Sequence, residues 1–333
     1  MVENQVLKKF RLIDAESKQH VSSCSEQDPT TIIRPIDEGT IDDVERQFST
    51  HKRVFDFHGK SALQSSSNTI VSIRETDFSC GKLGHKLWQS GLVLSMVLAQ
   101  VASTKIDEET PLPIISYIRR HQSSRLCFLE IGAGVGLPSA VILSLLSPSQ
   151  IVVSDFWRLP DDKGPVDRSR YVPTHWHGVN LQHNIGVSNT SHDDKCIVRV
   201  ERMDWRNDDA THLFREADIL VGSDLVYDAP DLQPLWKMLV QFLQSSIEGP
   251  RDDNDIAGVS RGPMHTQKHI VLVSPIWPEV RDELPEFLNI LRQGADDQLY
   301  GLAINKLDLF GVEAIADNDE KEGIFSFMHL WSL

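Results

Sequence analysis

The chain has 333 residues, a length that a single α/β domain with extensions can fill. Its formal net charge of −15 argues against a nucleic-acid-binding surface, which needs a basic stripe, and is compatible with a basic protein partner. The four cysteines form no CxxC pair, so we expect a protein of a reducing compartment, the cytoplasm or the nucleus. We also expect no action on membranes, because no apolar leader opens the chain and no apolar run is long enough to span a bilayer.

The first part of the chain is predicted to be peripheral. Residues 1–52 are polar and predict an extension with one short helix at 41–48. The alternating segments 54–58 and 69–73 predict a β-hairpin within residues 53–80, which precedes a catalytic core at 81–333 of the same domain. Helices are predicted at 87–98, where Trp88 stands at the beginning, and at 114–121. From the residues alone, Trp88 is better interpreted as a hydrophobic staple that holds its helix against the hairpin.

The central motif is at residues 126–136. A short apolar run there ends in Gly132, Gly134 and Gly136, and a helical pattern follows at 138–143. This order predicts a strand, a tight turn and a helix, in which the glycines let the backbone approach a ligand closely and the helix N-terminus presents unpaired N–H groups. The next strand, 151–155, brings Asp155 to its carboxyl end, where a ribose diol would be held.

Two classes of cofactor fit this arrangement. A nicotinamide enzyme normally has the spacing G-x-G-x-x-G, whereas this chain has G-x-G-x-G with Glu130 two residues before the first glycine. A carboxylate at that point suits a cationic ligand without phosphates, such as S-adenosylmethionine. The motif therefore favours a methyl donor, and a nicotinamide-dependent oxidoreductase is the alternative.

The second half continues the alternation of strands and helices. A long loop at 156–177 contains His175 and His177, but no third ligand has suitable spacing, so we predict no metal site. A strand at 217–223 is followed by Asp224 and Tyr227, at the sheet edge where ligands bind; Asp224 alternatively caps the next helix. The remaining predicted elements are helices at 178–185, 230–247 and 278–292, strands at 196–200, 269–274, 303–310 and 325–331, and a mobile insertion at 248–267.

Five features in this order carry a family resemblance. They are Trp88, the 130–136 run, Asp155, the Asp204-Trp205 pair and the D-x-x-Y tetrad at 224–227. Together they resemble the class I, seven-β-strand methyltransferases, and more narrowly family 16, which includes many protein lysine methyltransferases. The resemblance covers about residues 54–333. It implies an α/β fold with a doubly wound, Rossmann-like seven-stranded sheet and an N-terminal β-hairpin extension, with S-adenosylmethionine as the methyl donor and S-adenosylhomocysteine as the product.

The resemblance also implies a role for each matching residue. The residues expected to bind the donor are Glu130, Gly132, Ala133 and Gly134 at its methionine part, Asp155 at the ribose hydroxyls, Asp204 and Trp205 beside the adenine, and Ser223 and Trp88 as further contacts. The expected catalytic residues are Asp224 and Tyr227, which would shape the channel for the target amine.

The predicted function is therefore N-methylation of a lysine or another amine in a protein, by a monomer. The family suggests a translation factor or a chaperone as the partner. The segment between Trp88 and Glu130 and the loop after Asp155 are longer than in the family, and both flank the expected substrate entrance. Methylation of a small-molecule amine or hydroxyl, and a non-catalytic binding module with the same fold, are the alternatives.

Overall fold

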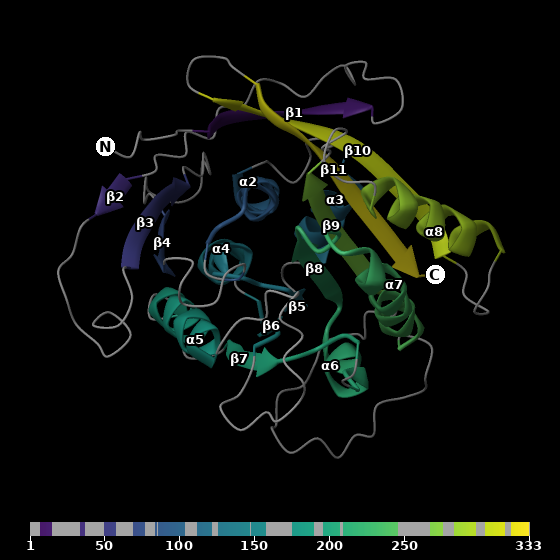
Figure 1. Cartoon of the computed structure of the whole chain (residues 1–333). Coiled ribbons are helices and arrows are strands. Elements are labelled where there is room, and N and C mark those ends of the chain that lie inside the picture. Colours follow the sequence, from purple (N-terminus) through teal and green to yellow (C-terminus); the bar gives the residue numbers. More distant parts are fainter. Residues whose placement is uncertain are drawn as a thin grey trace.

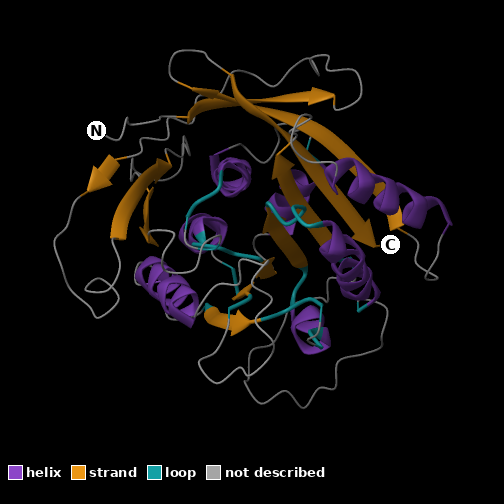
Figure 2. Cartoon of the chain, viewed as in Figure 1, coloured by secondary structure: helices purple, strands orange, loops and turns teal. Residues whose placement is uncertain are grey.

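A large twisted sheet with helices on both faces forms the centre of the molecule, as the computed structural model shows (Figures 1 and 2). The main sheet has eight strands in the order β1-β10-β11-β9-β8-β5-β6-β7, and a second sheet has the order β2-β3-β4. The structure describes residues 7–14, 34–36, 50–57, 69–76, 84, 86–103, 112–121, 126–146, 148–157, 175–189, 196–206, 209–245, 267–275, 283–297, 304–316 and 321–332.

The elements follow one another in a mostly alternating order. The strands are β1 (Leu7–Asp14), β2 (Arg34–Ile36), β3 (Thr50–Phe57), β4 (Thr69–Thr76), β5 (Cys127–Ile131), β6 (Gln150–Asp155), β7 (Ile197–Arg202), β8 (Ile219–Ser223), β9 (His269–Pro275), β10 (Ile304–Ala316) and β11 (Lys321–Ser332). The helices are α2 (Gln89–Ser103), α3 (Pro113–His121), α4 (Leu137–Leu146), α5 (His175–Asn189), α6 (Thr211–Glu216), α7 (Ala229–Gln244) and α8 (Glu283–Asp297).

The parallel strands set the position of the site. Strands β7, β6, β5, β8 and β9 are parallel, whereas β11 runs antiparallel between β9 and β10. The chain builds the sheet outward from β5 through β6 to β7 and then returns to β8 on the other side of β5. Ligands bind at such a reversal, outside the carboxyl ends of the strands. The carboxyl ends of β5, β6 and β8 therefore form the edge at which a site is expected.

Successive side chains of the central strands pack on opposite faces, as the alternation of a strand requires. Phe128 of β5 joins the apolar core under α2 and α4, and its neighbour Leu129 joins the core under α6, α7 and α8. Figure 1 shows α2, α4 and α5 on one side of the sheet and α7 and α8 on the other. The predicted doubly wound, Rossmann-like α/β fold is confirmed.

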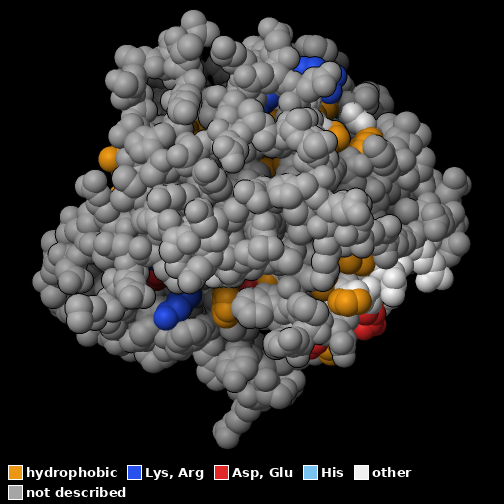
Figure 3. Space-filling model, turned by 90° about the horizontal axis from the view of Figure 1, so that it is seen from above, with side chains coloured by type: hydrophobic (Ala, Val, Ile, Leu, Met, Phe, Trp, Pro, Cys, Tyr) orange, Lys and Arg blue, Asp and Glu red, His pale blue; other side chains and the backbone are white. Residues whose placement is uncertain are grey.

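The small sheet lies outside the helical layer. Strands β3 and β4 pair antiparallel over the residues for which the sequence predicts a hairpin, and Arg53 stands opposite Ile73. Phe55, Val71 and Ile73 are buried in the same core cluster as α4. In the space-filling view, described hydrophobic side chains reach the visible face in several small separate groups (Figure 3). Among the described helices, none combines the length and the apolar character that a membrane span requires.

Several elements differ from the sequence predictions. Strand β1, which was not predicted, pairs antiparallel with β10 and adds an eighth strand to the expected seven. Helix α6 was not predicted either, and α8 begins at Glu283. Helix α5 begins at His175, so the assignment of His175 and His177 to the end of a long loop is wrong. The predicted helix at 41–48, the loop residues 158–174 and most of the 248–267 insertion lie outside the described residues.

Candidate active site

The glycine-rich turn joins β5 to α4 and needs glycine at each of its three positions. Gly132, Gly134 and Gly136 have φ values of 58°, 57° and 80°, in the left-handed region that disfavours other residues. A Cβ on Gly132 would overlap the side chain of Leu225, and one on Gly136 would lie 2.8 Å from Leu181. The turn is fixed to β6, because the N–H of Ala133 donates to the Ser154 carbonyl at 3.0 Å. The backbone itself thus lines this edge of the sheet.

Glu130 lies beneath the turn and is fully buried. Its Oε2 accepts hydrogen bonds from the backbone N–H of Ser139, at 3.0 Å, and from the Ser139 hydroxyl, which satisfies a donor in the first turn of α4. Burial raises the pKa of Glu130 to about 8, and the hydrogen bonds from Ser139 oppose that increase. The Oε1 atom is buried without a hydrogen-bond partner among the described residues. Glu130 therefore holds the first turn of α4 through Oε2, while its Oε1 is left for a further group.

Asp155 ends β6 and binds the glycine-rich turn. Its Oδ2 accepts a hydrogen bond from Gly134 N–H at 2.6 Å, and its Oδ1 accepts one from Phe156 N–H at 2.6 Å. His177 of α5 places Nε2 3.0 Å from the same Oδ2. The sequence placed Asp155 at this edge, and the structure adds that its carboxylate is held from three directions.

Asp204 and Trp205 follow β7 and approach the turn from the next strand. The Asp204 Oδ1 accepts hydrogen bonds from Arg206, at 3.0 Å from the backbone N–H and 3.2 Å from Nε. The ring of Trp205 lies against Gly132, since a Cβ there would be 3.6 Å from the ring. The Nε1 of Trp205 is buried and has no hydrogen-bond partner among the described residues. The two residues thus stand beside the glycine-rich turn, one of them with an unused donor.

The Asp224 to Tyr227 tetrad follows β8 and packs on the same turn through Leu225. Asp224 has φ 55°, and its N–H donates to the Val273 carbonyl at 2.8 Å. A non-glycine residue in this conformation is strained, and such strain is concentrated at functional sites. Tyr227 exposes 40% of its surface. Burial of the rest of the residue, together with the nearby charge of Asp155, raises its pKa above the usual range. Its phenol is therefore protonated at neutral pH.

Helix α2 contributes the remaining predicted residues. Trp88 directly precedes the helix and is 39% exposed, and its carbonyl accepts the N–H groups of Gly91 and Leu92. A Cβ on Gly91 would lie 3.4 Å from the hydroxyl of Ser223, at the end of β8. The start of α2 therefore lies against the carboxyl end of β8, which brings the Trp88 segment to the same edge as the glycine-rich turn.

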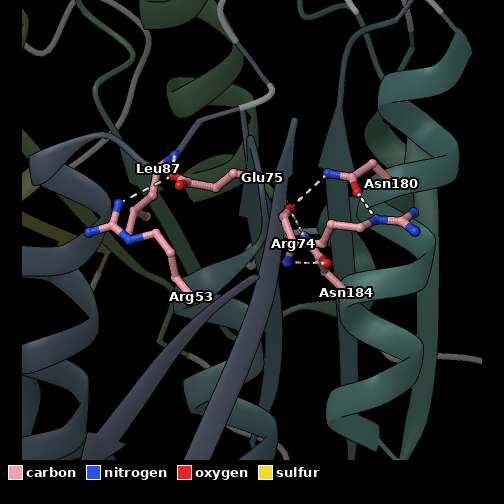
Figure 4. Close-up of polar contacts among 6 residues, drawn as sticks. All are labelled: Arg53, Arg74, Glu75, Leu87, Asn180 and Asn184. Atoms are coloured by element: carbon pink, nitrogen blue, oxygen red, sulfur yellow. Dashed lines mark hydrogen bonds and ion pairs between the residues drawn. The ribbon is translucent and has the colours of Figure 1, made fainter. Parts of the chain in front are cut away.

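Polar contacts join strand β4 of the hairpin to α5 and to the segment before α2 (Figure 4). The Asn184 amide accepts from Arg74 N–H at 2.8 Å and donates to the Arg74 carbonyl and to the Val135 carbonyl in the glycine-rich turn, both at 2.9 Å. The neighbouring Glu75 accepts from Leu87 N–H, next to Trp88, at 2.6 Å. Strand β4 is thus joined to the turn and to the start of α2.

Asn180 completes this group, because its Oδ1 accepts from Arg74 Nε at 2.7 Å. Sequence reasoning missed both asparagines, Arg74 and Glu75. The available signal was the spacing of Asn180 and Asn184, four residues apart, which places both amides on one face of a helix.

The residues of this edge fit an S-adenosylmethionine donor. A Cβ on Gly132 or Gly136 would collide with a neighbouring side chain, so the backbone is bare at these positions. The buried Oε1 of Glu130 has no hydrogen-bond partner among the described residues, and a cationic ligand beside it would favour the ionised form of this carboxyl group. Residues 65–161, which include β4, α2, the turn and β6, match the family model described as lysine methyltransferase. The chain is an S-adenosylmethionine-dependent methyltransferase. The described residues of this methyltransferase contain no group of three or more side chains that could hold a metal ion.

Solved structures similar to the methyltransferase include other methyltransferases. The M. jannaschii TYW2 structure in complex with AdoMet has a TM-score of 0.39 and 9% identity, covering 82% of this chain and 87% of that one. The methyltransferase domain of bacterial CtHen1 has a TM-score of 0.37 and 11% identity, covering 66% and 96%. The precorrin-6y C5,15-methyltransferase from Geobacter metallireducens has a TM-score of 0.34 and 10% identity, covering 69% and 94%. No curated protein matches the chain in sequence.

Proposed function

We propose that the protein methylates the side-chain amine of a lysine in a protein substrate in the cytoplasm or nucleus. The observation that carries this proposal is the position of the Asp224 to Tyr227 tetrad, which packs on the glycine-rich turn through Leu225 and exposes Tyr227. We assign the entrance for the target group to the exposed Tyr227, and the position nearer the donor to Asp224. This arrangement suits a long, narrow side chain such as lysine.

The chemistry requires alignment of a neutral nucleophile. When bound, S-adenosylmethionine supplies an electrophilic methyl group on a sulfonium, which is displaced in line. A lysine amine has an ordinary pKa near 10.4 and must lose a proton before it can attack. We assign to Asp224 the orientation of the neutral amine, and we assign to the phenol oxygen of Tyr227 a hydrogen bond accepted from an amine N–H, so that the nitrogen lone pair stays free to attack. The net charge of −15 favours approach of a basic segment of the substrate.

The first experiment is a transfer assay with radiolabelled methyl donor and cell extract. The expected result is label in protein that is recovered as methyl-lysine after hydrolysis. Label found only in the small-molecule filtrate would overturn the protein-lysine proposal in favour of a small amine or hydroxyl. Calorimetric titration with S-adenosylmethionine, and separately with NAD, checks the donor, and we expect binding of the former only.

Two variants test the roles within the tetrad. Asp224→Ala should lower turnover by about 100-fold, within the range for a group that takes part in proton transfer or orientation, and should leave S-adenosylhomocysteine affinity unchanged. Tyr227→Phe removes only the hydroxyl and should lower turnover by a smaller factor. Equal loss of turnover and of donor affinity in Asp224→Ala would contradict the assignment.

A further inference from the structure

His177 occupies an unusual position for a titratable side chain. It lies in the first turn of α5, is completely buried, and directs its ring at the carboxyl end of β6. Its Nε2 is 3.0 Å from Oδ2 of Asp155. None of the roles described above uses this histidine, and the sequence motif did not include it.

The surroundings of His177 fix its ring. Trp157 packs against it edge-on, with ring centroids 6.3 Å apart and an interplanar angle of 73°. Gly84 lies so close on another side that an added Cβ would be 2.6 Å from the ring. Trp157 is held in turn, because its carbonyl accepts from Nε of Arg202 at 2.6 Å. A ring enclosed in this way has one orientation, and that orientation faces Asp155.

The Asp155 carboxylate has a limited number of acceptor positions. An ionised carboxylate offers about four lone-pair directions, and the N–H groups of Gly134 and Phe156 take one on each oxygen. His177 approaches Oδ2, the oxygen that also accepts from Gly134. Two protein nitrogen atoms therefore lie against Oδ2 and one lies against Oδ1, so the larger free capacity is on Oδ1. A hydroxyl donor from a ligand would be directed to that oxygen.

We propose that His177 is a positioning residue that holds the Asp155 carboxylate in the orientation needed to bind the ribose hydroxyls of the methyl donor. The histidine acts through Asp155 and does not touch the ligand. It acts as an outer partner of a binding carboxylate, through the close approach of its Nε2 to Oδ2 at 3.0 Å. The proposal rests on the assignment of Asp155 to the ribose, which the experiment below tests separately.

The test compares two ligands by calorimetry: S-adenosylhomocysteine and its analogue that lacks the ribose 2′ and 3′ hydroxyls. In the unaltered protein the analogue should bind more weakly. His177→Leu should weaken the binding of S-adenosylhomocysteine by about tenfold, which corresponds to about 1.4 kcal/mol, and should change the affinity for the analogue by less than about twofold. His177→Gln, which retains an N–H donor at a similar reach, should recover most of the affinity.

Two glycine variants keep the histidine itself, and only the first of them alters its surroundings. Gly84→Ala adds a Cβ 2.6 Å from the ring and must displace it, so it should reproduce the selective loss of S-adenosylhomocysteine affinity. Gly186→Ala lies on α5, the helix that carries His177, and the added Cβ meets nothing within 4 Å. It is the matched control and should change neither affinity. Gly84→Ala also provides the test if His177→Leu fails to fold.

The possible failures are distinct. Equal affinity of the unaltered protein for both ligands would overturn the assignment of Asp155 to the ribose, and the proposal with it. A preference for S-adenosylhomocysteine that persists undiminished in His177→Leu and Gly84→Ala would overturn the role of His177 alone. Equal weakening of both ligands would show a general structural role and would overturn the proposal too. None of these measurements depends on methyl transfer, so they do not depend on whether the proposed lysine substrate is correct.

Discussion

Replacing Asn184 by alanine tests two roles of one buried amide, which holds strand β4 and also supports the glycine-rich turn. The amide pairs with the backbone of Arg74 in β4, and its second N–H reaches the Val135 carbonyl in the glycine-rich turn. After the replacement, the Arg74 carbonyl still accepts from Asn180 at 3.0 Å. The Arg74 N–H and the Val135 carbonyl each lose the bond to Asn184.

The expected magnitude follows from these two groups. A buried polar group left without its partner costs about 1–3 kcal/mol, so Asn184→Ala should lower the free energy of unfolding by about 2–6 kcal/mol. Release of Val135 should also loosen the turn. Loss of a hydrogen bond with a net value of about 1 kcal/mol corresponds to about fivefold weaker S-adenosylhomocysteine binding.

Asn180→Ala provides the matched comparison. Asn180 lies one turn earlier on α5 and contacts Arg74 by its Oδ1 and its Nδ2, whereas only Asn184 reaches the turn. Urea unfolding and calorimetric titration should therefore show that both variants lose stability, but that Asn184→Ala alone loses ligand affinity. Gln182→Ala, at an exposed position on the same helix, should change neither quantity. Equal loss of affinity in the Asn180 and Asn184 variants would refute this reasoning.

Two further predictions concern buried ionisable groups. The pKa of Glu130 is about 8 in the folded protein against 4.5 as its ordinary value, so the folded state holds a proton that the unfolded state releases between these pH values. This contribution to stability is complete below about pH 4.5 and is lost as the pH rises to about 8, at up to about 1.4 kcal/mol per pH unit. Glu130→Gln should therefore show a flatter decline in urea-unfolding free energy from pH 5 to 8, and parallel declines would contradict the pKa. Lys268 is buried and donates to the carbonyls of Phe214 and Ala217. Lys268→Met should therefore lower the free energy of unfolding by about 1–3 kcal/mol. Lys237→Ala, at an exposed position, should change it by less than about 0.5 kcal/mol in the same measurement.

Local patterns were sufficient to predict the centre of the fold. The alternate glycines after an apolar run predicted the turn, and their φ values agree, because no other residue type adopts that backbone as readily. Asp155 could be placed because a parallel strand delivers its last residue to the edge where ligands bind. The roles of these residues toward the donor remain predictions.

Features that depend on distant partners were not predicted. Strand β1 exists by pairing with β10, where Phe10 stands opposite Ala314, and neither segment alone indicates the other. The start of α5 was placed at Gly178 and not at His175, because the residues that follow Pro173 were assigned to the preceding loop. A Cβ on Gly178 would lie 2.6 Å from Trp157, so the glycine is required by packing. Misplacing the helix start concealed His177 from the predicted site.

The contacts of Asn184 with β4 also constrain how the chain matures during synthesis. Arg74 leaves the ribosome 110 positions before Asn184, which at about 5–20 residues per second is an interval of about 5–20 s. Strand β4 is the outer strand of its sheet, and until α5 is complete its free edge has no amide to occupy it. Nascent chains that have passed Thr76 but not Asn184 therefore present this edge of β4 without the contacts that Asn184 later makes to it.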